Sequence, residues 1–335
     1  MDLVSYQVKD EPYRLKLDAN ESMSYLKNEL LDVSDIECYP DFDSKQIRMA
    51  LSRDLNIDFS NITMGNGSSE LLDLLFKSFL SKDDVILSFD PSFSMYEIYA
   101  NIYEASFIKV PARNNFSCDI KDMIDKLVLN PKIIILCTPN NPTGYQLTRQ
   151  EIITLLSHTQ SLVIVDEAYI EFSINNETMI NDIATYPNLV VLRTFSKAYG
   201  LAGARLGYMI ASDPITSLIK KVRSPYHVNA LSQRIGIMAL EKKNSVIKGI
   251  NDIRDARKLL ASELDKLGFI VYPSQANFLF IKSPITSLSE KLKEKGVLIR
   301  RVMYLGKTYY RITVTHIDEM NLLLKYIKEV MYETK

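Results

Sequence analysis

Short apolar runs rich in β-branched residues alternate with amphipathic segments of helical length between about residues 43 and 240. Four runs stand out: Val85–Ser88, Ile133–Leu136, Leu162–Val165 and Leu189–Leu192. Runs of this length and composition are typical of strands that are buried on both faces of a parallel sheet, with helices packed outside. The pattern predicts an α/β fold with a large, mostly parallel sheet sandwiched by helices.

The pattern changes after about residue 246, where a long charged helix is followed by short strands near residues 270–271, 277–281 and 310–314 and by a closing helix. Such a mixture is typical of a smaller α+β domain. A chain of 335 residues, 47% of them hydrophobic, also exceeds what one core usually absorbs. We therefore expect a large domain over residues 35–245, and a small domain formed by residues 1–34, as an N-terminal arm, together with residues 246–335.

Three of the predicted strands end in polar clusters, at Thr138–Gly144, Asp166–Tyr169 and Thr194–Lys197. In open α/β sheets, ligands bind beyond the carboxyl ends of the strands. We expect the three clusters to converge on one crevice and to form the active site there.

Lys197 follows a predicted buried strand, where a low dielectric disfavours its charged form and makes the amine nucleophilic. Taken alone, a lysine is more often a solvated surface charge. Eight residues later, however, Arg205 lies among small residues that let the backbone approach a ligand, and an arginine grips phosphate with paired hydrogen bonds. Ser196 adds a hydroxyl to this candidate phosphate site.

A Gly-rich turn at Gly65–Glu70 precedes an apolar segment of helical length. The free N–H groups and the positive dipole end of a helix opening there would favour a phosphate, although an ordinary helix cap has the same sequence signature. Together with Lys197 and Arg205, the turn indicates a phosphate cradle.

Asp166 ends a predicted buried strand, so its carboxylate needs a partner that offsets desolvation. A protonated pyridine nitrogen would serve, and it would let the ring accept electrons from a substrate. Tyr169 and Asn141 could address a ring oxygen, and Phe93 could stack on the ring face. The alternatives are a wall residue for Tyr169, a simple turn around Asn141 and core packing for Phe93.

Composition narrows the function. Lys and Arg total 40 and Asp and Glu total 41, so no general field attracts nucleic acid or an acidic membrane. No signal-like segment opens the chain and no run approaches the length of a bilayer span, so we expect a cytoplasmic protein. The three cysteines and three histidines lack the spacing of a disulfide framework or a zinc site, and we expect no metal.

The motifs follow a fixed order along the chain: Leu17–Glu21, Tyr39–Asp41, Gly65–Gly67, Pro91–Tyr96, Asn141–Gly144, Asp166–Phe172, Ser196–Arg205, Ala276–Phe278 and Arg311–Val314. In this order the chain resembles, essentially end to end, the fold-type I pyridoxal-phosphate aminotransferases, and within them the histidinol-phosphate aminotransferase family. The ordered Asn-Pro-Thr-Gly, Asp-x-x-Tyr, Ser-Lys and Arg set is specific to the superfamily. The Asp-Glu-Ala-Tyr-x-Glu-Phe segment and the amino-terminal Leu-Asp-Ala-Asn-Glu indicate the narrower family.

The resemblance implies pyridoxal 5′-phosphate, bound as a Schiff base on Lys197, with Lys197, Asp166 and Tyr169 as catalytic residues. The cofactor-binding residues that it implies are Gly67, Ser68, Ser69, Phe93, Asn141, Asp166, Tyr169, Ser196, Lys197, Arg205 and, from a partner subunit, Tyr39. That last role implies a homodimer. The family often has tyrosine where Phe93 stands and Gly-Ala-Asp-Glu where residues 67–70 read Gly-Ser-Ser-Glu, but neither change removes a required charge.

The implied reaction moves an amino group from L-glutamate to imidazole-acetol phosphate, giving 2-oxoglutarate and L-histidinol phosphate in histidine biosynthesis. These anionic small molecules call for arginines. The substrate-binding residues that the resemblance implies are Tyr6, Asn20, Asn141, Arg300 and Arg311. Arg301, next to Arg300, would point to the opposite face of a strand, so the choice between the two stays open at this point.

Other activities also fit. Two enzymes of the same fold are threonine-phosphate decarboxylase, whose family typically opens with a His-Gly-Gly segment that this sequence lacks, and aromatic amino acid aminotransferase. A cofactor-dependent transcription regulator or an inert binding protein is the alternative from another class. Such regulators carry a DNA-binding domain before the aminotransferase part, whereas the first motif here begins at Leu17, and the lysine, aspartate and arginine together disfavour an inert scaffold.

Overall fold

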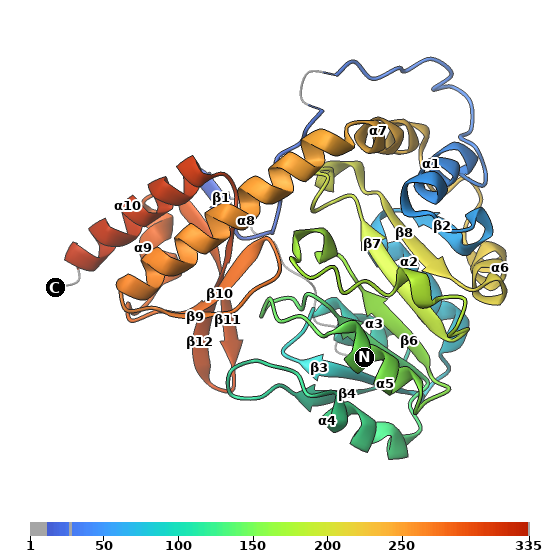
Figure 1. The fold of residues 1–335 in the computed structure, drawn as a ribbon, viewed down its shortest axis with the longest axis horizontal. Helices are drawn as coiled ribbons and strands as arrows, with labels where there is room; N and C mark the ends of the chain where they lie inside the picture. The colour runs from blue at the N-terminus through green and yellow to red at the C-terminus, as the bar shows by residue number, and fades with distance from the viewer. Residues whose placement is uncertain (1–11, 27–28, 334–335) are drawn as a thin grey trace.

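The computed structural model describes residues 12–26 and 29–333. Two separate β-sheets organise this part of the chain, and the smaller sheet joins a strand from the N-terminal segment to strands from the C-terminal part of the chain (Figure 1). Short 3₁₀ helices lie between the main elements, at Phe59–Asn61, Lys126–Leu129, Ile170–Phe172, Ile180–Asp182 and Ala202–Ala204.

The larger sheet has seven strands in the order β2-β8-β7-β6-β5-β3-β4. Their bounds are β2 (Ile62–Gly65), β3 (Val85–Asp90), β4 (Ser106–Pro111), β5 (Ile133–Cys137), β6 (Leu162–Asp166), β7 (Leu189–Thr194) and β8 (Gly207–Ala211). Neighbours from β7 to β4 pair in parallel, whereas β8 pairs antiparallel with both β7 and β2. The predicted mostly parallel sheet is confirmed, and the four sequence runs are four of its strands.

Helices cover both faces of this sheet: α1 (Lys45–Leu55), α2 (Gly67–Phe79), α3 (Met95–Ile102), α4 (Ile120–Asp125), α5 (Arg149–Leu156), α6 (Asp213–Val222) and α7 (Ala230–Glu241). Successive side chains of a strand point to opposite faces. Ile134 accordingly packs into one hydrophobic cluster and its neighbour Ile135 into another. This explains why the central strands are continuously apolar rather than alternating.

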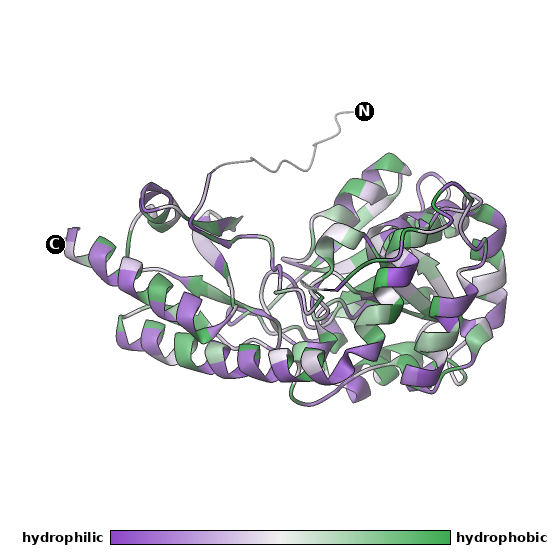
Figure 2. Ribbon diagram, turned by 90° about the horizontal axis from the view of Figure 1, so that it is seen from above, coloured by the Kyte–Doolittle hydropathy of each residue, from purple (hydrophilic) through white to green (hydrophobic). Residues whose placement is uncertain are grey.

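The smaller sheet has five strands in the order β1-β11-β12-β10-β9. They are β1 (Leu15–Leu17), β9 (Ile270–Tyr272), β10 (Phe278–Lys282), β11 (Val297–Tyr304) and β12 (Lys307–Thr313), accompanied by α8 (Lys243–Lys266), α9 (Leu288–Glu294) and α10 (Ile317–Glu333). Hydrophobic and hydrophilic residues alternate around α8 and α10 (Figure 2), because each helix buries one side only. The predicted smaller α+β part is confirmed, while the exact domain boundaries stay a prediction.

The N-terminal segment joins the smaller sheet through β1, which pairs in parallel with β11. The long helix α8 starts at the end of the larger part and packs on β9 and β10. Within the described ranges, the structure contains no helix long and apolar enough to cross a membrane.

Candidate active site

The three polar clusters line one cavity of about 380 Å³ at the carboxyl ends of β5, β6 and β7. Its wall also includes residues from the N-terminal segment, from α2 and from β12. The lining residues are Ala19, Asn20, Ser68, Ser69, Phe93, Met95, Cys137, Asn141, Asp166, Ala168, Tyr169, Thr194, Ser196, Lys197, Arg205 and Arg311. The structure therefore brings together most of the site residues suggested by the sequence.

Lys197 enters this cavity just after β7, and its Nζ donates a hydrogen bond to the carbonyl of Ala19 at 3.0 Å. Burial lowers the pKa of Lys197 to about 7, and the nearby charges of Arg311 and Arg205 add to that effect, whereas Glu21 opposes it. A substantial fraction of the amine is thus uncharged near neutral pH, as a nucleophile that condenses with an aldehyde requires.

Asp166 is the last residue of β6, and its side chain is buried. The Tyr96 hydroxyl donates to Oδ2 at 2.7 Å, and the Ala168 N–H donates to Oδ1 at 3.1 Å. Burial raises the pKa of Asp166, while these two donors act in the opposite direction. Among the described residues, no cation forms an ion pair with this carboxylate, so a positively charged ring nitrogen would supply the missing partner.

The first turn of α2 and Arg205 face each other at another end of the cavity. Gly67 has φ of +73°, and a Cβ added there would lie 2.7 Å from Arg205 Nη2, so only glycine fits without a shift. Arg205 also lies 3.5 Å from the Ser196 hydroxyl. Helix N–H groups and a guanidinium that converge in this way form an anion site suited to phosphate.

Hydrogen bonds connect the smaller sheet and the N-terminal segment to residues that line the cavity. Arg311 donates to Asn141 Oδ1 at 2.6 Å and to the carbonyl of Asp18 at 2.6 Å. Asn20 Nδ2 donates to the Tyr169 hydroxyl at 3.1 Å. Burial raises the pKa of Tyr169 far above its usual range, so the phenol keeps a proton that it can donate to a ligand oxygen.

Phe93 lies at the cavity wall and meets Tyr96 edge to face, with ring centroids 5.6 Å apart. Sequence reasoning missed Tyr96, which is fully buried and contacts both Phe93 and Asp166. One signal was available. Tyr96 lies three residues after Phe93, in the turn that opens α3, and a buried tyrosine hydroxyl usually has a hydrogen-bond partner.

Arg300 lies directly opposite Arg311 in the antiparallel β11–β12 pair, so both side chains lie on the same face of the sheet. Arg301 lies on the other face, where it pairs with Glu290 at 3.2 Å and is half exposed. The register thus favours Arg300 over Arg301 as the residue on the cavity side.

Tyr39 is not among the residues that line the cavity, and neither is Arg300. Tyr39 is 81% exposed, and its ring stacks on Tyr226 with centroids 4.6 Å apart. Tyr6 lies outside the described residues.

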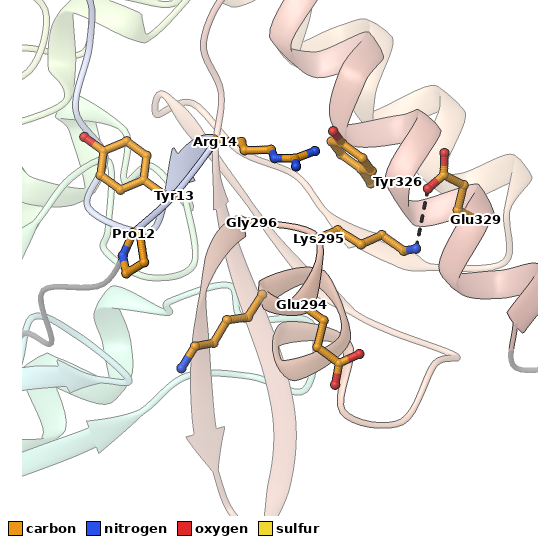
Figure 3. Close-up of a pocket in the computed structure, with 9 residues that line it drawn as sticks. Pro12, Tyr13, Arg14, Glu294, Lys295, Gly296, Tyr326 and Glu329 are labelled. Atoms are coloured by element: carbon orange, nitrogen blue, oxygen red, sulfur yellow. Dashed lines mark ion pairs between the residues drawn. The ribbon is translucent and has the colours of Figure 1, made fainter.

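A larger cavity, of about 480 Å³, lies beside β1, α9 and α10 (Figure 3). Its charges are partly neutralised within the chain, because Lys295 pairs with Glu329 at 3.5 Å and with Glu333 at 2.8 Å. It lacks the buried, convergent polar groups of the smaller cavity, which we take as the candidate active site.

The smaller cavity fits pyridoxal 5′-phosphate on chemical grounds. It offers an amine with a lowered pKa, a buried carboxylate for the ring nitrogen, a phenol for the ring oxygen and an anion site for the phosphate. It also places an arginine above these groups, where a substrate anion would lie.

Comparison with known proteins gives a consistent result. The family model for aminotransferase class I and II matches residues 1–327. A histidinol-phosphate aminotransferase of Thermoanaerobacter sp. (strain X514) is 37% identical over 340 residues, covering 98% of this chain and 96% of the relative.

Two solved structures support the fold. The histidinol-phosphate aminotransferase of Clostridium acetobutylicum superposes with a TM-score of 0.88 at 26% identity, covering 95% of this chain and 99% of that one. The histidinol-phosphate aminotransferase of Sinorhizobium meliloti, in complex with pyridoxal-5′-phosphate, superposes with a TM-score of 0.89 at 22% identity, covering 97% and 92%. The fold expected from the sequence resemblance is thereby confirmed.

Proposed function

The chain belongs to the aminotransferase class I and II family, and from that premise we propose that it transfers the amino group of L-glutamate to imidazole-acetol phosphate, giving L-histidinol phosphate and 2-oxoglutarate. The single observation that carries the aminotransferase chemistry is the convergence of Lys197, Asp166 and Arg205 on one cavity. The choice of substrate is supported by the relatives that share about a third of the sequence over almost the full chain.

Pyridoxal 5′-phosphate supplies an electron-accepting ring that stabilises negative charge on the α-carbon of the bound substrate. Asp166 would keep the ring nitrogen protonated, and Tyr169 and Asn141 would donate to the ring oxygen. Phe93 would stack on the ring. Ser196, Arg205 and the amides of Gly67, Ser68 and Ser69 would hold the phosphate, since these residues lie around one end of the cavity.

Lys197 Nζ holds the cofactor and then moves a proton to or from the substrate α-carbon. Its lowered pKa suits this work, because a general base is most effective when its pKa lies near the working pH. The Ala19 carbonyl, 3.0 Å from Nζ, orients the amine.

Arg311 and Arg300 bind the anionic groups of the substrates from the face of the smaller sheet that covers the cavity. Glutamate brings two carboxylates and histidinol phosphate brings a phosphate, and a guanidinium suits both. Asn20 and Tyr6 complete the substrate side of the site in this proposal.

We also propose a homodimer in which Tyr39 reaches the cofactor phosphate of the partner subunit. A set of large hydrophobic residues is exposed along one stretch of the chain and beside it: Leu30, Val33, Ile36, Tyr39, Phe42 and Tyr226. Contiguous exposed apolar surface of this kind favours association. The mass of the protein in solution, measured by light scattering, tests this, and a monomer would contradict it.

We further propose that the enzyme is cytoplasmic, that it acts on small molecules and that it has no nucleic acid partner. Three free cysteines are consistent with a reducing compartment. The formal net charge of −1 offers no general attraction to a polyanion.

The test is the absorption spectrum of the holoenzyme during titration with L-histidinol phosphate, beside a Lys197→Ala variant. The proposal predicts loss of the visible band of the bound cofactor, its return with 2-oxoglutarate, and neither change in the variant. A band that responds to another amino acid but not to histidinol phosphate would keep the enzyme class and overturn the substrate. Release of carbon dioxide from threonine phosphate would favour the decarboxylase instead.

A further inference from the structure

Phe116 lies in the loop between β4 and α4 with a backbone conformation that phenylalanine seldom adopts, at φ of +62°. Local hydrogen bonds build this loop. The Arg113 N–H donates to the Ser117 carbonyl and the Phe116 N–H donates to the Arg113 carbonyl, both at 2.8 Å, while Asn115 Oδ1 accepts from the Ser117 N–H at 3.1 Å. The loop therefore projects one aromatic ring away from the larger sheet in a fixed direction.

The ring enters an aromatic cage on the smaller sheet, formed by Tyr272, Phe280, Tyr304 and Tyr309. Its centroid lies 4.7, 5.0, 5.7 and 5.1 Å from theirs in that order. Phe116 is only 3% exposed. Figure 1 shows the loop before α4 meeting the ends of β11 and β12. Burial of the ring offsets the cost of the left-handed backbone.

This contact is separate from the main hydrophobic core. Leu279 and Ile281 of β10 point into the core that includes residues of α8, whereas Phe280 between them points to the opposite face, into the cage. The two parts of the molecule thus meet through the continuous core on the α8 side and through Phe116 on the other side of the smaller sheet.

The face held by Phe116 also carries the arginines. Phe280 lies opposite Arg311 across the β10–β12 pair, and Arg300 lies opposite Arg311 across the β11–β12 pair, so the three side chains form a row on one face. Tyr309 of the cage precedes Arg311 by two residues on the same strand face. A shift of the cage relative to the larger sheet would therefore move Arg311 away from Asn141.

A second tether acts on the same hairpin. The Tyr304 hydroxyl at the end of β11 donates to the carbonyl of Asp90 at 2.9 Å, and Asp90 ends β3 just before the segment that leads to Phe93. The Tyr304 tether joins the β11–β12 hairpin to the end of β3, next to the segment of Phe93, whereas the Phe116 tether joins it to the loop after the edge strand β4.

We propose that Phe116 is a positioning residue for substrate binding, since its ring in the aromatic cage holds Arg311 and Arg300 at the distance from the cavity at which they meet an anionic substrate. The inference rests on the proposed function to the extent that it takes Arg311 as a substrate ligand. Phe116 itself touches neither cofactor nor substrate.

The test compares the holoenzyme with Phe116→Asn, since asparagine tolerates a positive φ and removes the ring. Two readouts are measured: the Kd of succinate, an unreactive dicarboxylate, by calorimetry, and hydrogen exchange of the amides in Lys307–Thr313. We expect a Kd roughly tenfold higher, because a misplaced guanidinium loses its geometry, and faster exchange in β12. Cofactor affinity and the spectrum of the bound cofactor stay unchanged.

Tyr304→Phe keeps the ring and removes the hydrogen bond to the Asp90 carbonyl. We expect smaller changes in the same direction, and this variant provides the test if Phe116→Asn does not fold. Val128→Asn is the matched control, since Val128 lies in the 3₁₀ helix after α4 and is 85% exposed, and it should change neither readout. A folded Phe116→Asn protein that melts at a lower temperature, but binds succinate and exchanges like the control, would reduce the ring to a structural role and overturn the inference.

Failure of the two proposals can be told apart. A wild-type enzyme that binds succinate but transaminates no amino donor contradicts the proposed function, while the comparison of succinate affinities still decides the role of Phe116. A wild-type enzyme that binds no succinate contradicts the role of Arg311 and overturns the inference with it.

Discussion

Asp166 and Glu167 are consecutive buried carboxylates at the end of β6, yet their surroundings differ. Glu167 Oε2 accepts from Arg193 Nε at 2.9 Å, from Arg193 Nη2 at 2.8 Å and from the Thr178 hydroxyl at 2.8 Å. Its Oε1 accepts from the Met179 N–H at 2.7 Å. The chain itself supplies both the counter-charge and the hydrogen bonds that this carboxylate needs.

Asp166, in contrast, lines the candidate active site. The side chains of consecutive residues in an extended chain point to opposite faces, so those of Asp166 and Glu167 point in different directions. The hydrogen-bond donors to Asp166, Tyr96 and the Ala168 N–H, are neutral. The last residue of β6 and the residue that follows it thus use a buried carboxylate in two different ways. Glu167 has its counter-charge and hydrogen bonds within the fold, whereas Asp166 forms no ion pair with any described residue, and we propose that the cofactor ring nitrogen supplies its positive charge.

The largest effect is expected for Glu167→Gln, which removes the counter-charge of buried Arg193. We expect the free energy of unfolding to fall by about 3–5 kcal/mol, because the change leaves an uncompensated buried charge. Urea denaturation measures the loss. Turnover per folded molecule should stay close to that of the wild type. A loss of turnover without a loss of stability would contradict the structural role of Glu167.

Asp166→Asn should show the opposite behaviour. The amide cannot keep the ring nitrogen protonated, so kcat/KM should fall by roughly 10²- to 10³-fold, as when other preorganised electrostatic groups are removed. In the cofactor-free protein, the free energy of unfolding should stay level or rise, because the variant no longer buries a carboxylate without a cationic partner. A decrease in the free energy of unfolding as large as that of Glu167→Gln would contradict the difference in role between the two carboxylates.

Tyr96→Phe sharpens the comparison, since it removes one neutral donor from Asp166 and keeps the ring against Phe93. A hydrogen bond to a charged group contributes about 1.5–3 kcal/mol, so kcat/KM should fall by roughly 10- to 150-fold. In the Asp166→Asn background the same change should cost much less, because the charge it supports is gone. Equal losses in both backgrounds would show that Tyr96 acts by packing alone.

A further prediction concerns the cofactor-free protein. The pKa of Lys197 falls from 10.5 to about 7 on folding, so between these values the unfolded chain binds more protons than the folded one. The free energy of unfolding should therefore contain a contribution from Lys197 that increases as pH rises from about 7 to 10.5. Denaturation across this range, beside Lys197→Met, measures it, and identical pH profiles would contradict the lowered pKa.

The sequence predicted the parts of the fold that depend on burial on both faces. Strands β5, β6 and β7 are continuous apolar runs, and the polar residues after them could be assigned to one edge of the sheet. The edge strand β4 was not predicted because most of its residues are partly or fully exposed, and β8 was not because Gly207–Ala211 directly follows the motif that contains Arg205.

The candidate site was predictable where a residue type and its local neighbours carry the chemistry, as for Lys197 after a strand. It was not predictable where the position of a side chain depends on strand pairing or on contacts between distant parts of the chain. The choice of Arg300 over Arg301 needs the pairing with Arg311. The place of Phe116 depends on a loop that meets a sheet more than 150 residues away in sequence, and no local pattern encodes that contact.

In the proposed enzyme, Lys197 carries the cofactor in the cavity beyond β7. Borohydride reduction of the holoenzyme, which fixes a covalently held cofactor to its lysine, followed by proteolysis and mass spectrometry, tests it most directly. The account predicts the cofactor mass on the peptide that contains Lys197 and on no other lysine. Label on a different lysine, or none on a protein that retains the visible cofactor band, would contradict it.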